Sequence, residues 1–203
     1  MNLGEMKDWV VRTTKRPEKR DEQIQDAINA AIEYATTQGD FSADLVESSV
    51  AISSSVYAQS LVIADVMPRF RKVKYLRPIN YRRYLTHRDP TKIFEERRDS
   101  IGFKRDGYQA VDIWYRAGAN IVFSLSNLQT SMLYGYFAYP AFLTDDADTH
   151  WMLDQVRTCI HDLACWRVFE QIGDKEEASR FFGMGQKLLV AHKSDLTDGV
   201  SYS

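Results

Sequence analysis

Residues 24–35, IQDAINAAIEYA, decide how this chain folds. Their apolar members recur at intervals of three and four positions, so they form one stripe along an α-helix. Asp21 and Glu22 precede the stripe and Gly39 follows it, which is typical of a helix start and a helix end. The spacing therefore predicts an amphipathic helix that packs against other helices. The stripe consists of Ile24, Ala27, Ile28, Ala31, Ile32 and Ala35.

Helical patterns also occupy both ends of the chain. An earlier helix is predicted from Leu3, Met6 and Val10, which share one face, and residues 149–192 return to helical spacing. Gly173 predicts a helix end there, and Asp174 predicts the N-cap of a last helix. Gly183 and Gly185 lie inside that last helix, where each costs about 1 kcal/mol relative to alanine. We therefore expect another backbone to approach closely at both glycines.

The middle of the chain, residues 41–140, has a different pattern. β-Branched and aromatic residues come in short runs, some alternating with polar residues as half-buried strands do. A turn around Gly118 joins two of these runs and predicts a hairpin. Short helices are expected at residues 79–85 and 91–98. The predicted strands are residues 45–53, 60–64, 72–76, 111–115, 121–126 and 132–139.

Together these patterns predict an α+β fold. Two N-terminal helices (residues 3–38) and two long C-terminal helices (149–192) form a helical bundle, into which an antiparallel β region (41–140) is inserted. No low-complexity linker separates these parts, so residues 1–192 are expected to form a single domain. Residues 193–203, KSDLTDGVSYS, lack a helical period and are expected to form an extended C-terminal tail that orders on a partner.

Composition excludes several classes of protein. The 203 residues, 44% of them hydrophobic, suffice for one domain with an elaborated insertion. A net charge of -2 argues against a protein that coats nucleic acid through bulk charge. No apolar run approaches the roughly 20 residues that a membrane helix needs, and the N-terminus lacks the apolar stretch of a signal peptide. We expect synthesis in the cytoplasm and no membrane partner.

The two cysteines do not predict a metal or redox site. Cys159 and Cys165 are six positions apart in a helical pattern, so they point to opposite sides and cannot pair. His161 shares a face with Cys165, but zinc needs three or four converging ligands and Cys159 points away. We therefore predict buried free thiols, with no metal and no cofactor.

The acidic turn at residues 144–150, TDDADTH, admits two interpretations. Asp148 and His150 would do acid–base chemistry in a small hydrolase if they converged in a pocket that shifted their pKa values. The turn also lies directly before a helix, where Asp and Thr cap backbone N–H groups. Capping is the favoured interpretation. The motif spacings of common hydrolases, metalloproteases and nucleotide-binding proteins do not occur, and we predict that the chain is not an enzyme.

Charge is unevenly distributed along the chain. Residues 69–105 hold 13 basic and 4 acidic residues, a net charge of +9, which leaves -11 on the remainder. This basic stretch either contacts phosphates, or pairs with the acidic part of a neighbouring copy in a head-to-tail ring, or is a solvated face with local ion pairs. The overall charge favours the last two. The candidates for a subunit interface or a DNA-facing lumen are Arg71, Lys72, Lys74, Arg82, Arg83, Arg97 and Arg98.

The order of the parts carries a family resemblance. The opening LGEM (residues 3–6) and the helix at 24–35 are closed by Gly39-Asp40-Phe41, the β-rich middle leads to residues 134–139, and LTDDADTHWMLD (143–154) leads into helices split at Gly173. In this order the chain resembles the head–tail connector, or adaptor, proteins of tailed double-stranded DNA phages. It departs from them at His150, where they commonly have Asn.

The resemblance implies a non-enzymatic virion protein at the head–tail junction, made in the host cytoplasm. Such proteins form a ring, typically of twelve copies, that joins the portal protein to a downstream tail or nozzle protein. Double-stranded DNA passes through the lumen without sequence specificity, and no cofactor is used. A nucleic-acid-binding protein using residues 69–105 is the alternative. The C-terminal segment grips the portal in this family, which assigns portal binding to Ser194, Asp195, Leu196, Thr197, Val200 and Tyr202.

Overall fold

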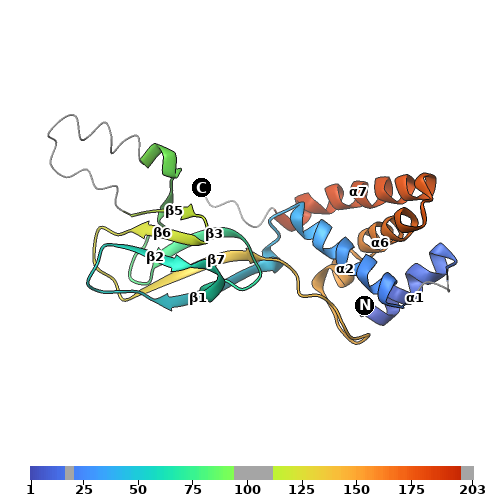
Figure 1. Ribbon diagram of the computed structural model, residues 1–203, viewed down its shortest axis with the longest axis horizontal. Coiled ribbons are helices and arrows are strands. Elements are labelled where there is room, and N and C mark those ends of the chain that lie inside the picture. The colour runs from blue at the N-terminus through green and yellow to red at the C-terminus, as the bar shows by residue number, and fades with distance from the viewer. Residues whose placement is uncertain (17–20, 94–111, 198–203) are drawn as a thin grey trace. The chain divides into compact units, whose positions relative to one another are not determined.

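The computed structural model describes residues 1–16, 21–93 and 112–197, with only the backbone described for 194–197. It confirms an α+β fold whose residues fall into two compact units (Figure 1). We call Met1–Asp44 with Tyr139–Ser203 the helical unit, and Leu45–Ala138 the sandwich unit. The sandwich unit begins and ends close to the predicted limits of the β region.

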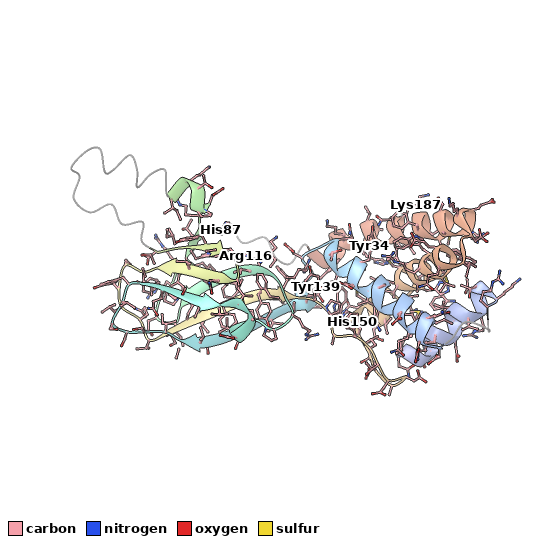
Figure 2. All side chains as sticks on the ribbon, in the orientation of Figure 1. Tyr34, His87, Arg116, Tyr139, His150 and Lys187 are labelled. Carbon is pink, nitrogen blue, oxygen red and sulfur yellow. The ribbon has the colours of Figure 1, made fainter. Side chains whose placement is uncertain are left out.

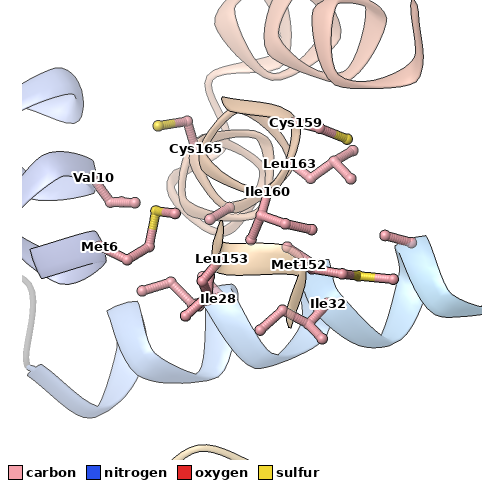
Figure 3. Close-up of a cluster of buried hydrophobic side chains, with 14 of the residues drawn as sticks. Met6, Val10, Ile28, Ile32, Met152, Leu153, Cys159, Ile160, Leu163 and Cys165 are labelled. Atoms are coloured by element: carbon pink, nitrogen blue, oxygen red, sulfur yellow. The ribbon is translucent and has the colours of Figure 1, made fainter. Parts of the chain in front are cut away.

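The helical unit packs its helices around one apolar core. Every residue of the predicted stripe at 24–35 is buried, at most 2% exposed, and so are Leu3, Met6 and Val10. These side chains meet Met152, Ile160 and Leu163 from the C-terminal half of the chain (Figure 3). The helices are α1 (Leu3–Thr14), α2 (Asp21–Thr37), α5 (Trp151–Gln155), α6 (Arg157–Ile172) and α7 (Lys175–Thr197), with a 3₁₀ turn at Ser42–Asp44.

The C-terminal helices begin and end largely where the sequence predicts. Gly173 ends α6 with a positive φ of 81°, and the carboxylate of Asp174 accepts a hydrogen bond from the backbone N–H of Glu177 at 3.2 Å. One break was not predicted: Val156, at φ -128° and ψ 34°, separates α5 from α6. Its buried side chain still belongs to the core, so apolar spacing alone concealed the break.

The two glycines inside α7 differ. A Cβ placed on Gly185 would lie 2.9 Å from the side chain and 3.4 Å from the backbone nitrogen of Leu163 on α6, which confirms the predicted close approach of another backbone. A Cβ on Gly183 would meet no atom within 4 Å, so the same prediction is wrong for Gly183 within this chain.

Helix α7 continues to Thr197, into the segment predicted to be an extended tail. The prediction that the tail begins at residue 193 is therefore wrong. Adding a residue to an existing helix gains one hydrogen bond without a new nucleation step, and no glycine or proline occurs between 193 and 197 to stop it. The weak apolar periodicity of residues 193–197 therefore did not predict where this helix ends.

The sandwich unit consists of two sheets that share one core. One sheet has the order β1-β7-β3 and the other the order β2-β6-β5-β4. All pairs are antiparallel, as predicted, except that β4 pairs with β5 in parallel. Gly118, at φ +60°, forms the predicted hairpin turn between β5 and β6. The strands are β1 (Leu45–Ala51), β2 (Ala58–Val62), β3 (Phe70–Pro78), β4 (Thr86–His87), β5 (Ile113–Ala117), β6 (Asn120–Ser124) and β7 (Ser131–Ala138).

Two local predictions in this unit are wrong. Residues 79–85 form turns rather than a helix, because the backbone N–H of Leu85 bonds to the carbonyl of Leu76 and places Leu85 in the core. The second strand ends at Val62 and is followed by a short helix, α3 (Ile63–Val66), where a strand through residue 64 was expected. Residues 90–93 are helical; the rest of the predicted helix at 91–98, and Val111 at the start of a predicted strand, lie outside the described residues.

Candidate interaction surface

The acidic turn at 144–150 is a backbone-bonding structure. The carboxylate of Asp148 accepts hydrogen bonds from the backbone N–H groups of Asp145 at 2.9 Å and Thr144 at 2.7 Å, which lower its pKa. His150 is the N-cap of α5, where its Nδ1 accepts from the N–H of Met152 at 3.3 Å. The two side chains thus bond separate stretches of backbone. This arrangement supports the capping interpretation, with His150 rather than Asp or Thr at the cap, and argues against the hydrolase alternative.

The same turn holds the start of α1. The carbonyls of Asp148 and Asp146 accept hydrogen bonds from the N–H groups of Leu3 at 2.9 Å and Gly4 at 3.0 Å. The ammonium group of Lys7 lies 2.8 Å from a carboxylate oxygen of Asp146 and 2.8 Å from one of Asp21. The first N–H groups of a helix lack partners within it, and here a distant segment supplies them. The turn therefore joins the N-terminal helix to the segment that precedes α5.

The cysteines are free and buried, as predicted. The thiol of Cys159 lies 3.4 Å from the carbonyl of Gly185, and Cys165 Sγ lies 3.5 Å from Nε2 of His161. Burial raises the pKa of Cys159 to about 12 and also raises that of Cys165, so neither forms the reactive thiolate at neutral pH.

His161 belongs to a buried network that the sequence did not reveal. Its ring stacks on Trp9 with centroids 4.1 Å apart, and its Nδ1 lies 3.0 Å from the carboxylate of Asp162. Its Nε2 lies 2.8 Å from the hydroxyl of Thr13, so the network joins α1 to α6. Within the described residues no group of three or more His, Cys, Asp or Glu side chains is placed to hold a metal ion.

The basic stretch is placed on and after β3. The strand has irregular register between Phe70 and Lys72 and again between Val73 and Tyr75. The residues at these irregularities, Arg71 and Lys74, both lie over the ring of Phe137, at 5.2 Å and 5.8 Å from its centroid. Thus β3 brings Arg71, Lys72 and Lys74 together. The exposed Arg82 and Arg83 lie in the turns after the strand, and Arg97 and Arg98 lie outside the described residues.

Residues from β3, β4 and β5 line an open hollow of about 350 Å³. We call it the basic hollow; it is lined by Phe70–Lys74, His87, Trp114 and Arg116. Among the described residues that line it, four are basic and none is acidic. Figure 2 shows His87 and Arg116 close together on the sandwich unit, at the edge formed by β4 and β5.

Arg116 is the functional candidate that the sequence did not identify, because it lies outside the basic stretch. Its guanidinium lies 5.3 Å from the ring centroid of Phe70, and its Nε donates to the carbonyl of Gly118 at 3.0 Å. The sequence placed Arg116 at the end of the predicted hairpin strand. It did not show which other strands pair with that strand, so it did not place Arg116 near the cations of β3. Cations held by aromatic rings in a hollow can bind an anionic group.

The chain thus combines a helical unit with a β-sandwich unit that carries a basic hollow. None of the helices in the described ranges is long and apolar enough to cross a membrane.

The chain belongs to the SU10 adaptor protein family, whose family model matches residues 1–199. It is therefore a phage structural adaptor and a component of the virion, which interacts with other virion proteins. A search of the curated proteins finds no match.

Proposed function

We propose that this adaptor forms a head-to-tail connector ring between the portal and the tail. In this proposal about twelve copies, the number implied by the resemblance to connectors, sit beneath the portal at the head–tail junction. A downstream tail or nozzle protein binds the other side, and double-stranded DNA passes through the lumen without sequence specificity. Membership of the adaptor family supports this function.

The main observation that supports the proposed ring is that the two units have net charges of opposite sign. The helical unit contains 12 basic and 20 acidic residues, a net charge of -8. The sandwich unit contains 14 basic and 8 acidic residues, a net charge of +6. A chain with two complementary surfaces favours a heterologous contact with its next copy, and such contacts close into rings.

The C-terminal segment is the proposed portal-binding element. It includes Ser194, Asp195, Leu196 and Thr197 at the end of α7, while Val200 and Tyr202 lie outside the described residues. Because α7 is helical through Thr197, the first part of this segment would reach the portal as a helix rather than as an extended strand.

The test is co-expression with the portal protein of the same phage, followed by size-exclusion chromatography and electron microscopy. We expect co-migration and a ring bound to the portal. Deleting residues 193–203 should abolish co-migration, whereas deleting only 198–203 should weaken it, because part of the binding segment stays. Failure of the full chain to co-migrate would contradict the proposed function, and full binding by both truncations would contradict the role of the C-terminal segment.

The basic hollow also favours a second candidate function, contact with duplex DNA. Phosphate binding predicts an affinity that falls steeply with salt, with a log–log slope near -0.9 per phosphate contacted. Fluorescence anisotropy with a labelled duplex tests this function. An absence of binding at low salt would remove it.

A further inference from the structure

We propose that the basic hollow of one copy receives the acidic face of α2 from a second copy. The inference deepens the proposed ring and rests on it, because it names the two surfaces that meet. The first surface is concave and cationic, and the second is a convex helix face.

The basic hollow has the chemistry of a carboxylate site. Arg116 and Arg71 are held over aromatic rings, at 5.3 Å and 5.2 Å from the centroids of Phe70 and Phe137, so their guanidinium groups lose little freedom when they bind an anion. Lys72 is exposed beside them. An arginine fork pairs with a carboxylate through two parallel hydrogen bonds.

The acidic face of α2 complements this hollow. Helix α2 contains four acidic residues and neither lysine nor arginine. Three of them, Glu22, Asp26 and Glu33, are exposed and follow the spacing i, i+4, i+11, so they lie on one face of the helix. Like charges at i, i+4 destabilise a helix, and a cationic partner would relieve that repulsion.

The charges of the two units favour a second copy over DNA as the occupant. The helical unit of a second copy, with a net charge of -8, is an attractive partner for the +6 sandwich unit, whereas the net charge of -2 on the whole chain disfavours DNA binding through bulk charge. The contact joins different surfaces on the two copies, so each copy keeps one hollow and one acidic face for its next neighbours.

A zero-length carbodiimide crosslinker tests the contact directly, because it joins a carboxylate to a lysine amine only when the two touch. Unlabelled and ¹⁵N-labelled full chains are mixed at low ionic strength, crosslinked and digested. We expect mixed-isotope peptides that link Glu22, Asp26 or Glu33 to Lys72 or Lys74. Links with no mixed-isotope form, or no links between these segments, would overturn the proposal.

Charge reversal tests whether the contact drives association. We expect K72E/R116E and E22K/D26K each to weaken self-association at least tenfold in sedimentation experiments at the concentration where crosslinks form. Mixing the two variants, or combining all four changes in one chain, should restore it. The control D8K/E176K reverses two exposed acidic residues on other helices and should leave association unchanged, and circular dichroism confirms folding of each variant.

The outcomes separate this contact from the proposed function. Unchanged self-association of both reversed variants, with portal binding retained, would overturn the contact and leave the connector function standing. Restored association in the charge swap, without portal binding by the wild-type chain, would support the contact and contradict the connector function. Loss of duplex binding by K72E/R116E with self-association intact would assign the hollow to DNA and overturn the proposal.

Discussion

The helical unit and the sandwich unit bury their apolar residues in different ways. In the helical unit the core comes from stripes that are continuous in the sequence, such as Ile24 to Ala35 on α2. In the sandwich unit the packing depends on which strands become neighbours. The central strand β7 illustrates this: the ring of Tyr75, from β3, lies over Gly135, and its hydroxyl donates to Glu47 on β1. The spacing of apolar residues in the sequence therefore predicts the core of the helical unit well and the core of the sandwich unit only in part.

The two units also differ in how they use charge. The helical unit has an acidic excess, part of which serves its own fold, since the turn at 144–148 binds the start of α1. The sandwich unit has a basic excess, and several of its cations lie over aromatic rings. This contrast suggests that the units are stabilised separately and meet other proteins through different chemistry.

The largest expected effect comes from substitutions that leave a cavity in one core, and these test whether the two units are independently stable. Ile160 in the helical core and Ile121 in the sandwich core are both 0% exposed. Replacing either with alanine leaves a cavity, which costs about 2–5 kcal/mol. We expect hydrogen exchange followed by mass spectrometry to show Ile160→Ala increasing exchange in the helical unit and Ile121→Ala in the sandwich unit. Equal increases in both units for either variant would show that they unfold together.

The next effect concerns the cross-strand packing of the sandwich unit. A Cβ on Gly135 would lie 2.5 Å from the ring of Tyr75, so Gly135→Ala forces that ring to move. We expect a loss of about 1–3 kcal/mol in urea unfolding, as for overpacked sites. The double variant Gly135→Ala with Tyr75→Ala should lose less than the sum of the single changes. Strict additivity would show that the two residues do not interact.

These two units also show what the sequence could and could not predict. The helix at 24–35, the hairpin at Gly118 and the cap at Asp174 were predictable because each depends on residues a few positions apart. The basic hollow was only half predictable: the cations of β3 are contiguous, but Arg116 joins them only through the pairing of strands. The helix at 193–197 was missed because helix propagation needs little apolar periodicity.

Alanine substitutions at the two glycines of α7 should change the stability of the helical unit by smaller amounts and with opposite signs. Alanine at Gly183 meets no atom within 4 Å, so we expect Gly183→Ala to stabilise the isolated chain by about 1 kcal/mol. Alanine at Gly185 gains the same helix propensity but contacts Leu163 at 2.9 Å, and we expect a net loss of about 1 kcal/mol. Thermal unfolding of both variants measures the difference. Stabilisation by both would show that Leu163 moves aside at little cost.

The smallest effect tests whether the acidic excess of the helical unit contributes to its own fold. Lys7 Nζ lies 2.8 Å from carboxylate oxygens of both Asp21 and Asp146. Both carboxylates are 73% exposed, so water screens the pairs, and Lys7→Met should cost only about 0.5–1 kcal/mol. We expect urea unfolding at neutral pH to show this loss, with Lys187→Met, on an exposed position of α7, as the control that leaves stability unchanged.

The pH dependence of that effect has a definite sign. Burial lowers the pKa of Lys7, but the hydrogen bonds to Asp146 and Asp21 raise it more, so its pKa in the folded chain lies above the ordinary value. The stabilisation by Lys7 is then fully present below the unfolded lysine pKa of about 10.4 and is lost as the pH rises through the folded value. The stability difference between wild type and Lys7→Met should therefore stay constant from pH 7 to about pH 10 and shrink above it. A difference that stays constant above pH 10, or that grows as the pH rises, would mean that the ammonium group gains nothing from the two carboxylates.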